Sequence, residues 1–471
     1  MNHEVKNNNS IADHPAPKAA SGESGEIICA VSTPPGTGGI AIVRLSGEGS
    51  IAMADSVFRS PAGKKLSEQK AYTLHFGQII ENENVLDEVL VSIFHAPHSF
   101  TGEECIEISC HGSIYIQQEL VKLLLSKGAR LALAGEFTRR AFRNGKMDLS
   151  QAEAVADVIA ATSQAAHRLS MNQMRGGFAK ELNVLRDQLL QFASLIELEL
   201  DFSEEDVAFA NRRHLSDLAQ EIESVLSRLT SSFGVGNAIK NGIPVAIIGE
   251  TNAGKSTLLN LLLHEDKAIV SDIHGTTRDV IEDTININGV MFRFIDTAGI
   301  RETSDAIESM GIRRTFDKIQ QASIVLWLID LSTPDRQIKK LSKSIIPSLK
   351  GKHTILVFNK SDKLSPEEIA AKQHLLPDLE AERIFISAKQ RRNTDKIQDL
   401  LLNAAQIPQV GNEDVIVTNL RHYEALNQAL TSIHRIQEGL YKGISHDFLA
   451  QDIRECMFYI GEITGQISTN E

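Results

Sequence analysis

The stretch PVAIIGETNAGKST (residues 244–257) decides the fold of the central part of the chain. Its apolar run is followed by a loop that fits the pattern G-x-x-x-x-G-K-[ST] from Gly249 to Ser256. The pattern needs a buried strand, a glycine-rich turn and a helix start, because the backbone N–H groups of the turn then face a chain of phosphates. Lys255 supplies a point charge, and the Ser256 hydroxyl can bind Mg²⁺. The stretch therefore predicts a nucleotide-binding α/β domain.

Further apolar runs of the buried parallel-strand type follow this loop and alternate with helical patterns. They read FRFIDTAG, IVLWLID, TILVFNK and RIFISAK. Such alternation predicts a doubly wound, Ras-like α/β domain, which binds ligands at the carboxyl ends of its strands. We expect this domain to span residues 241–407.

The sequences before and after this domain have different patterns of apolar residues. Residues 25–145 combine short apolar strands with a helical stretch, which predicts an α+β domain. Residues 146–240 and 408–471 carry apolar residues at three- and four-residue spacing, which is typical of amphipathic helices. We expect these two segments to pack together as one discontinuous helical domain, with the α/β domain inserted in it. Residues 1–24 lack the apolar core of a signal peptide and are expected to form a disordered tail.

Bulk composition narrows the class of protein. The chain has 471 residues, 42% of them hydrophobic and 23% charged, as in ordinary folded proteins of several domains. Its net charge of −13 argues against a general binder of polyanions, which needs clustered Lys and Arg. The four cysteines show no zinc-site spacing, and no apolar run is long enough to span a membrane. We therefore expect a reduced, cytoplasmic protein with buried thiols.

The motifs after the phosphate loop follow the order of a GTPase. GTTRD supplies Thr277, whose hydroxyl can coordinate Mg²⁺ and close over a γ-phosphate. DTAG supplies Asp296, which can hold Mg²⁺ through water, and Gly299, whose N–H can meet the γ-phosphate. NKSD supplies Asp362, whose carboxylate can accept from N1–H and the 2-amino group of guanine but finds no such donors on adenine. We therefore predict GTP as the nucleotide, with SAK (residues 387–389) completing the base pocket.

The residue after DTAG is Ile300, where many GTPases carry a glutamine that orients the attacking water. A side-chain oxygen of Asn252 could instead help to hold a monovalent cation beside the β- and γ-phosphates, or Asn252 could merely hydrogen-bond its own loop. A carboxylate of Glu302, Asp305 or Glu308 could orient the water, or these residues could form a solvated turn. The residue types alone do not choose among these alternatives.

Together these motifs resemble the tRNA-modification GTPase family MnmE, also called TrmE. The resemblance runs over residues 25–465 and rests on NAGKSTLLN, IHGTTRDV, DTAGIRE, STPPGTGGIAIVRLSG, SFTGEECIEISCHG, GEFTRRAFRNGKMDLSQAEAVADVI and EITG. It implies a GTP hydrolase that drives addition of an aminomethyl-type group to C5 of the wobble uridine of certain tRNAs. It also implies stimulation by K⁺, with Asn252, Ser271, Ile273 and Thr276 at the positions of the K⁺ ligands.

The same resemblance completes the expected catalytic site. Glu308 is at the position of the acidic residue that orients water, so Lys255, Thr277 and Glu308 are the expected catalytic residues. The expected Mg²⁺ ligands are Ser256, Thr277 and, through water, Asp296. The residues expected to bind GTP are Asn252, Ala253, Gly254, Lys255, Ser256, Thr257, Ser271, Asp272, Ile273, His274, Gly275, Thr276, Thr277, Asp296, Thr297, Ala298, Gly299, Asn359, Lys360, Asp362, Ser387, Ala388 and Lys389.

The N-terminal domain is similar to the family's folate-binding dimerisation domain, with Arg44, Glu107 and Lys146 at matching positions. This implies a tetrahydrofolate derivative, 5-formyl- or methylene-tetrahydrofolate, as a one-carbon donor. The chemistry is consistent, because a folate's glutamate tail attracts cations and its pterin ring offers N–H groups to a carboxylate. Without the resemblance, Arg44 and Lys146 would be interpreted as surface charges and Glu107 as the exposed side of a strand.

The resemblance further implies a homodimer joined through the N-terminal domains, a heterotetramer with the flavoprotein MnmG, and tRNA as a partner, with no membrane. One alternative is a GTP-switched ribosome-assembly factor without modification chemistry, although the acidic net charge argues against it. Another is a scaffold that binds GTP without hydrolysing it.

Family members end in a Cys-Ile-Gly-Lys tail whose cysteine is needed for modification. This chain ends in EITGQISTNE, and Cys456 lies upstream in a predicted helix, so nucleotide and folate binding are expected to persist while modification needs a separate test.

Overall fold

The computed structural model describes residues 25–201, 212–265, 283–295, 316–373, 375–377, 379–405 and 415–466. The expected disordered tail, residues 1–24, lies outside these ranges. The chain divides into two compact units, Met1–Val155 and Ala156–Glu471, and each is described by itself. Among the helices of the described ranges, none combines the length and the hydropathy needed to cross a bilayer.

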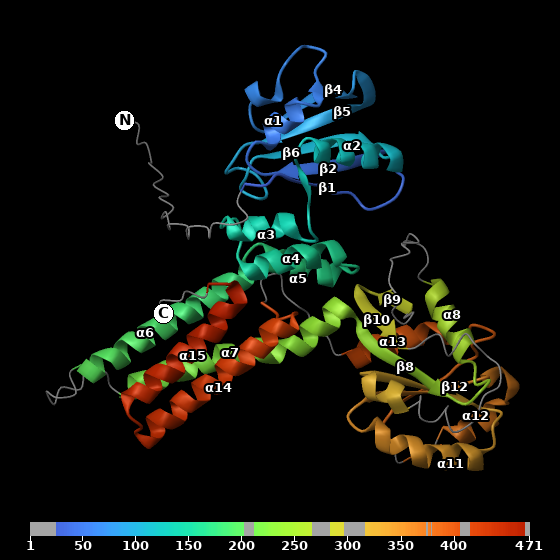
Figure 1. Ribbon diagram of the computed structural model, residues 1–471. Coiled ribbons are helices and arrows are strands. Elements are labelled where there is room, and N and C mark those ends of the chain that lie inside the picture. Colours follow the sequence, from blue (N-terminus) through green and yellow to red (C-terminus); the bar gives the residue numbers. More distant parts are fainter. Residues whose placement is uncertain are drawn as a thin grey trace, which may run out of the picture. The chain divides into compact units, whose positions relative to one another are not determined.

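A seven-stranded sheet, in the order β3-β4-β5-β6-β2-β1-β7, forms the centre of the first unit (Figure 1). Neighbouring strands are antiparallel except for β1 and β7, which run parallel. The strands are β1 (Ile28–Val31), β2 (Ile40–Ser46), β3 (Phe58–Arg59), β4 (Thr73–Glu81), β5 (Asn84–Phe94), β6 (Cys105–His111) and β7 (Arg130–Leu131). The helical elements are α1 (Ser50–Asp55), η1 (Leu66–Glu68), α2 (Ile114–Ser126), α3 (Glu136–Arg143) and α4 (Leu149–Ala160), whose last turn enters the second unit.

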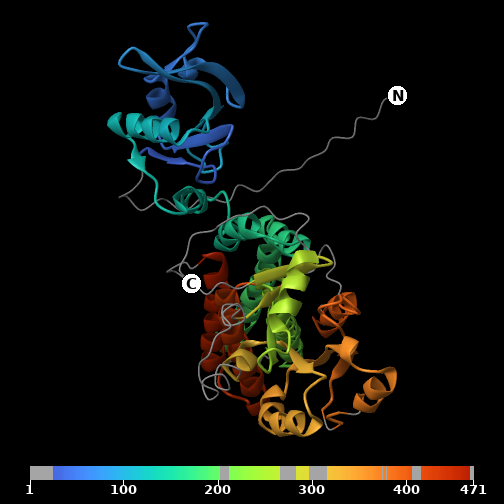
Figure 2. The same cartoon turned by 90° about the vertical axis from the view of Figure 1, so that its right-hand side faces the viewer.

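Strand β6 shows why this sheet has one buried and one open face. Ile106 and Ile108 belong to the core, whereas Glu107 and Ser109 are partly exposed. This period of two is the pattern of a half-buried strand. Helix α2 covers the core face and packs against β1, β2, β5 and β6 (Figure 2). The α+β domain expected from the sequence is therefore confirmed.

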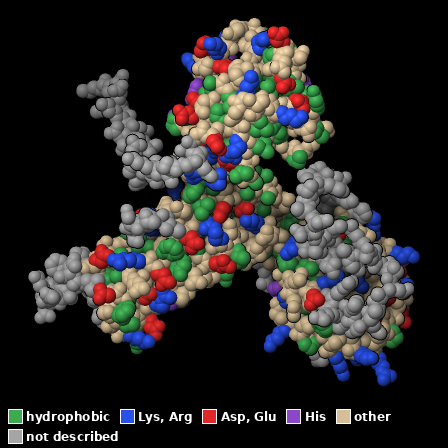
Figure 3. Space-filling model, viewed as in Figure 1, with side chains coloured by type: hydrophobic (Ala, Val, Ile, Leu, Met, Phe, Trp, Pro, Cys, Tyr) green, Lys and Arg blue, Asp and Glu red, His purple; other side chains and the backbone are tan. Residues whose placement is uncertain are grey.

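The opposite face of this sheet carries exposed apolar side chains. Phe76 of β4 is the register partner of Leu90 of β5, which in turn pairs with Ser109 of β6. Phe76, Leu90 and the neighbouring Leu74 are all exposed. Figure 3 shows hydrophobic side chains reaching the surface of this unit.

Long helices of the second unit pack side by side into a bundle (Figure 1). They are α6 (Gly177–Asp201), α7 (Arg212–Asn241), α14 (Leu420–Lys442) and α15 (His446–Thr464), and α5 (Gln164–Met174) precedes them. On α6 the buried residues Leu185, Leu189, Phe192 and Ile196 recur at helical spacing and face the bundle core. Because α14 and α15 follow the α/β domain in the chain yet pack on α6 and α7, the predicted discontinuous helical domain is confirmed.

A six-stranded sheet in the order β13-β12-β11-β8-β10-β9 forms the α/β part of this unit. Its strands run parallel except for β9, which is antiparallel to β10. The strands are β8 (Ile243–Gly249), β9 (Asp283–Ile287), β10 (Val290–Phe294), β11 (Ile324–Asp330), β12 (His353–Asn359) and β13 (Glu382–Phe385). The helical elements are α8 (Lys255–Glu265), α11 (Asp335–Ile345), η2 (Ile346–Leu349), η3 (Ser361–Lys363), α12 (Pro366–Lys372) and α13 (Asp395–Ala405).

The sheet is buried on both faces, as its continuous apolar runs predict. On β11, Leu326 belongs to one core cluster and the next residue, Trp327, to the other. Strand β9 was not predicted, because its sequence DTINI alternates polar and apolar residues and so lacks a continuous apolar run. Only Ile285 and Ile287 of β9 are fully buried, as expected for a strand at the edge of a sheet.

Candidate functional site

The phosphate loop lies between β8 and α8, as its sequence predicts. Gly249 ends β8 with a φ of +146°, and a Cβ atom there would lie 2.3 Å from the Leu328 carbonyl oxygen of β11. Lys255 begins α8 and donates from Nζ to the carbonyl oxygens of Gly249 and Glu250, at 2.8 Å each. Burial lowers the pKa of Lys255, and the positive charge of Lys318 lowers it further. An anion in this loop would replace carbonyl acceptors with charged ones and stabilise the ammonium.

Asn252 occupies the left-handed region of backbone space inside this loop, with a φ of +63°. Asparagine adopts this conformation more readily than most residues do. Its side chain is exposed, and the hydrogen bonds of the described residues include none from it to its own loop. Two roles were considered for Asn252 from the sequence, a cation ligand and a hydrogen bond to its own loop. The hydrogen bond is not formed within the described residues.

Asn359 connects the three loops that the sequence analysis assigned to the nucleotide. Its side chain is almost fully buried and donates from Nδ2 to the Ala253 carbonyl of the phosphate loop at 2.8 Å. Its Oδ1 accepts from the backbone N–H of Lys360 at 2.8 Å and of Ala388 at 3.0 Å. Gly254 must be a glycine, because a Cβ atom there would lie 2.3 Å from Asn359 Nδ2. One amide side chain thus fixes the base-binding loops against the phosphate loop.

Asp362 and Ser387 lie side by side at the predicted base pocket. Ser387 Oγ donates to Asp362 Oδ1 at 2.5 Å and accepts from the Gln390 backbone N–H at 3.2 Å. The hydrogen bond from Ser387 keeps the pKa of Asp362 below its usual value, with the positive charge of Lys389 adding to the effect. The carboxylate is therefore ionised at neutral pH, which is the state needed to accept two N–H donors from guanine.

Lys360, between these residues, also has a left-handed backbone, with a φ of +66°. Its Nζ donates to Asp330 Oδ2 at the end of β11, at 2.5 Å. Burial raises the pKa of Asp330, but hydrogen bonds from Lys360 and Ser332 outweigh this and keep the pKa below its usual value. The Lys360 side chain is thereby held across the edge of the sheet where parallel strands end.

The remaining predicted nucleotide residues fall in two groups. Ser256 and Thr257 lie in the first turn of α8, beside Lys255. The others lie outside the described residues: Ser271, Asp272, Ile273, His274, Gly275, Thr276, Thr277, Asp296, Thr297, Ala298, Gly299 and Glu308, together with Ile300, Glu302 and Asp305. Among the described residues, no His, Cys, Asp and Glu side chains gather as a metal site. Mg²⁺ fits the hydroxyl of Ser256, because it prefers oxygen ligands.

A second site lies on the open face of the N-terminal sheet. Arg44 of β2 and Glu107 of β6 are register partners, and Arg44 Nε and Nη2 lie 2.9 and 2.7 Å from Glu107 Oε1. The Arg44 guanidinium also lies 5.6 Å from the ring centre of Phe100 and 5.5 Å from that of Phe137. Both distances fall within the range of a cation–π contact. The structure therefore brings two of the three expected residues together and adds two aromatic rings.

Lys146, the third expected residue, contacts the loop between β5 and β6. Its Nζ donates to the Pro97 carbonyl at 3.0 Å, and its Cγ and Cδ atoms pack beside Gly102, 3.3 Å from where a Cβ atom there would lie. Pro97 and Gly102 belong to the segment 95–104 between β5 and β6, which also carries Phe100. Sequence reasoning missed Phe100 and Phe137, although they stand within the quoted stretches SFTGEE and GEFTRR.

The cysteines are all buried and free, as expected. Burial raises the pKa of Cys105 and of Cys456 to about 12, so neither thiol is a ready nucleophile. Cys456 lies within α15, in agreement with the helix predicted there.

Comparisons with known proteins agree across the chain. Residues 27–146 match the family model described as the GTP-binding protein TrmE N-terminus, and residues 149–471 match the MnmE helical domain. The tRNA modification GTPase MnmE of Bacteroides thetaiotaomicron is 62% identical over 449 residues, which cover 94% of this chain and 96% of that protein. Those of Bacteroides fragilis strain YCH46 and Flavobacterium johnsoniae are 60% and 52% identical over 451 residues each, covering 94% of this chain and 96% of each relative. The chain therefore belongs to the tRNA modification GTPase MnmE family.

Proposed function

We propose that this chain is a GTP hydrolase that acts in the modification of tRNA. Family membership supports the reaction class, and the observation that carries the nucleotide assignment is the position of Asn359. Its side chain holds the NKSD and SAK loops against the phosphate loop, so that one ligand with a base and phosphates can touch all three. The ionised Asp362 selects guanine, because adenine would leave this carboxylate without donors.

Residues of the phosphate loop bind and orient the phosphates in this proposal. The backbone N–H groups at the start of α8 and the Lys255 ammonium stabilise the negative charge that shifts during phosphoryl transfer. Ser256, Thr277 and, through water, Asp296 would hold Mg²⁺, which neutralises charge on the β- and γ-phosphates when bound. Glu308 would orient the attacking water in place of the glutamine absent at Ile300.

A K⁺ ion would be held by Asn252, Ser271, Ile273 and Thr276. The exposed Asn252 side chain supports this assignment, since it is not engaged with its own loop within the described residues. Its amide oxygen is a suitable ligand for a hard cation. Held by these residues, the cation would supply the positive charge that an arginine finger supplies in other GTPases.

The site at Arg44, Glu107 and Lys146 would bind a tetrahydrofolate derivative, 5-formyl- or methylene-tetrahydrofolate. The guanidinium and the ammonium can attract the carboxylates of a glutamate tail, and Glu107 can accept N–H donors from a pterin. Phe100 and Phe137 offer rings on which a flat heterocycle can stack. The exposed apolar pair Phe76 and Leu90 on the same sheet face is consistent with a homodimer joined through this domain.

MnmG and tRNA are the proposed partners, and an aminomethyl-type group on C5 of the wobble uridine is the proposed product. Family membership argues against the ribosome-assembly alternative.

The assignment as a GTP hydrolase is tested by measuring phosphate release from GTP and from ATP by the purified full chain, with Mg²⁺ and K⁺ present. Repeated turnover of GTP and none of ATP is the expected result. GTP that binds and stays intact would instead identify a non-hydrolysing scaffold.

A further inference from the structure

The two rings that contact Arg44 come from different segments of the first unit. Phe100 lies in the segment 95–104 between β5 and β6, and Phe137 lies in α3. Phe100 is exposed and Phe137 is half-buried, so packing alone does not fix either ring. A stable arrangement of both rings at Arg44 therefore needs a connection between the segment and the helix.

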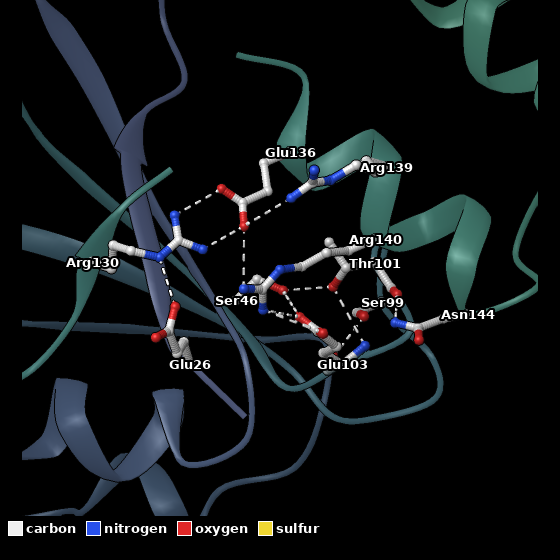
Figure 4. Close-up of polar contacts among 10 residues, drawn as sticks. All are labelled: Glu26, Ser46, Ser99, Thr101, Glu103, Arg130, Glu136, Arg139, Arg140 and Asn144. Carbon is white, nitrogen blue, oxygen red and sulfur yellow. Dashed lines mark hydrogen bonds and ion pairs between the residues drawn. The ribbon is translucent and has the colours of Figure 1, made fainter. Parts of the chain in front are cut away.

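An ionic network centred on the buried side chains of Arg140 and Glu136 supplies this connection (Figure 4). Arg140 of α3 donates from Nη1 to both carboxylate oxygens of Glu103, at 3.0 and 3.3 Å, and its Nη2 lies 3.4 Å from Glu136 Oε1. Arg130 donates to the two oxygens of Glu136, at 2.7 and 3.1 Å, and to Glu26 Oε2 at 2.7 Å. The side chains of Arg140 and Glu136 are only 7% and 1% exposed. The contact between Arg140 and Glu136 joins charged groups removed from water, and such contacts are strong and directional.

The residues on both sides of Phe100 are anchored to this network. Ser99 Oγ donates to the Glu103 carbonyl at 2.6 Å, and Thr101 Oγ1 lies 2.6 Å from Ser46 Oγ at the end of β2. Ser46 Oγ also lies 2.8 Å from Glu103 Oε2. Asn144, directly after α3, donates from Nδ2 to the Thr101 carbonyl at 2.7 Å.

We propose that Arg140 is a positioning residue for the Arg44 site: by joining α3 to the segment 95–104, it holds Phe137 and Phe100 against the Arg44 guanidinium. Arg140 touches both Glu103 and Glu136, and without its charge the buried Glu136 carboxylate and the partly buried Glu103 carboxylate would lose a shared counter-charge. The segment would then move away from α3 and take Phe100 with it. The choice of ligand rests on the folate binding proposed above, whereas the positioning of the rings does not.

The first test measures binding of 5-formyltetrahydrofolate to the full chain by calorimetry. Arg140→Met is expected to weaken binding by about tenfold or more, because it removes the charged link between segment and helix. Arg140→Lys is expected to recover only part of this loss, since an ammonium lacks the two-pronged geometry that reaches both carboxylates. Lys122→Met is the control, because Lys122 is exposed on α2 and forms its ion pair with Glu119 of the same helix.

A double-mutant comparison separates positioning from a general loss of structure. In a chain that already carries Phe100→Leu and Phe137→Leu, Arg140→Met is expected to change the remaining affinity by less than about twofold, because the rings it positions are gone. A full tenfold loss in that background would overturn the proposal.

A second readout needs no folate. The sequence has one tryptophan, Trp327, which is buried in the α/β domain, so an indole introduced by Phe137→Trp can be followed by its quenching with acrylamide. Arg140→Met is expected to raise this quenching constant by roughly twofold or more, and Lys122→Met to leave it unchanged. An unchanged constant in Arg140→Met would overturn the positioning role. Failure of the parent chain to bind folate, with quenching still raised by Arg140→Met, would overturn only the proposed ligand.

Discussion

Replacement of Asn359 by alanine is expected to uncouple the base-binding loops from the phosphate loop. The Asn359 side chain is 3% exposed, and it forms one donated and two accepted hydrogen bonds with backbone groups of three loops. Asn359→Ala would leave the Ala253 carbonyl and the N–H groups of Lys360 and Ala388 without these partners. No other side chain described here joins all three loops.

The expected magnitude follows from these three hydrogen bonds. At about 1 kcal/mol each, the loss amounts to ~3 kcal/mol, which corresponds to roughly 10²-fold in GTP affinity if the loops close only when nucleotide binds. Asn359→Asp tests the direction of the donated bond. It keeps both accepted bonds but places a carboxylate oxygen 2.8 Å from the Ala253 carbonyl oxygen, so it should weaken binding at least as much as alanine does.

The assay is a fluorescence titration of the full chain with a labelled guanine nucleotide, together with thermal unfolding in the absence of nucleotide. Asn241→Ala provides the control, because Asn241 is exposed at the end of α7 and its side chain donates to Asn237 Oδ1 of the same helix. A nucleotide affinity within about threefold of the parent in Asn359→Ala would refute this reasoning, since it would mean that the three bonds contribute less than ~1 kcal/mol together.

Four other substitutions test separate parts of the account. Asp362→Asn should lower the preference for GTP over ATP by roughly 10–100-fold in competition titrations, because the amide presents an N–H where guanine needs an acceptor. Glu308→Ala should lower steady-state turnover by about 10²–10⁴-fold with nearly unchanged GTP affinity, whereas Ile300→Gln should raise turnover little. Glu136 should make the first unit sensitive to acid, because the hydrogen bonds from Arg130 lower its pKa from 4.5 to about 2. The folded pKa of Glu136 lies below the unfolded value, so its contribution to stability is present above pH 4.5 and is lost as the pH falls toward 2. Glu136→Gln should therefore reduce the change in the free energy of unfolding over this pH range by up to ~3 kcal/mol, as measured by unfolding curves.

Much of the α/β fold follows from local patterns in the sequence. The runs ending in Gly249, Asp330 and Asn359 are continuous and apolar, and each became a strand buried on both faces; those ending in Gly249 and Asn359 carry their motif at the carboxyl end. Strand β9 escaped this reasoning because an edge strand is buried on alternate positions only. Its pairing with β10 does have a local signal, the Asn288-Gly289 dipeptide between the two strands, where both residues adopt the positive φ of a two-residue hairpin turn.

The site residues also differ in how far the local sequence predicts their roles. Motif residues such as Lys255 and Asp362 carry their chemistry in their own type and spacing, so the sequence alone could assign them. The joining role of Asn359 depends on Ala253, which is 106 positions away, and the contact of Phe137 with Arg44 depends on the docking of α3. Such long-range contacts have no period or spacing in the sequence, and only the folded chain brings them together.

The most direct test of the proposed mechanism is the rate of GTP hydrolysis in KCl compared with NaCl at equal ionic strength, for the parent chain and for Asn252→Ala. If a cation held at Asn252 stabilises the charge that develops on the phosphates, the parent should turn over at least about tenfold faster in KCl, and Asn252→Ala should lose this difference while still binding GTP. Equal rates of the parent in both salts, or an undiminished K⁺ effect in Asn252→Ala, would contradict the account.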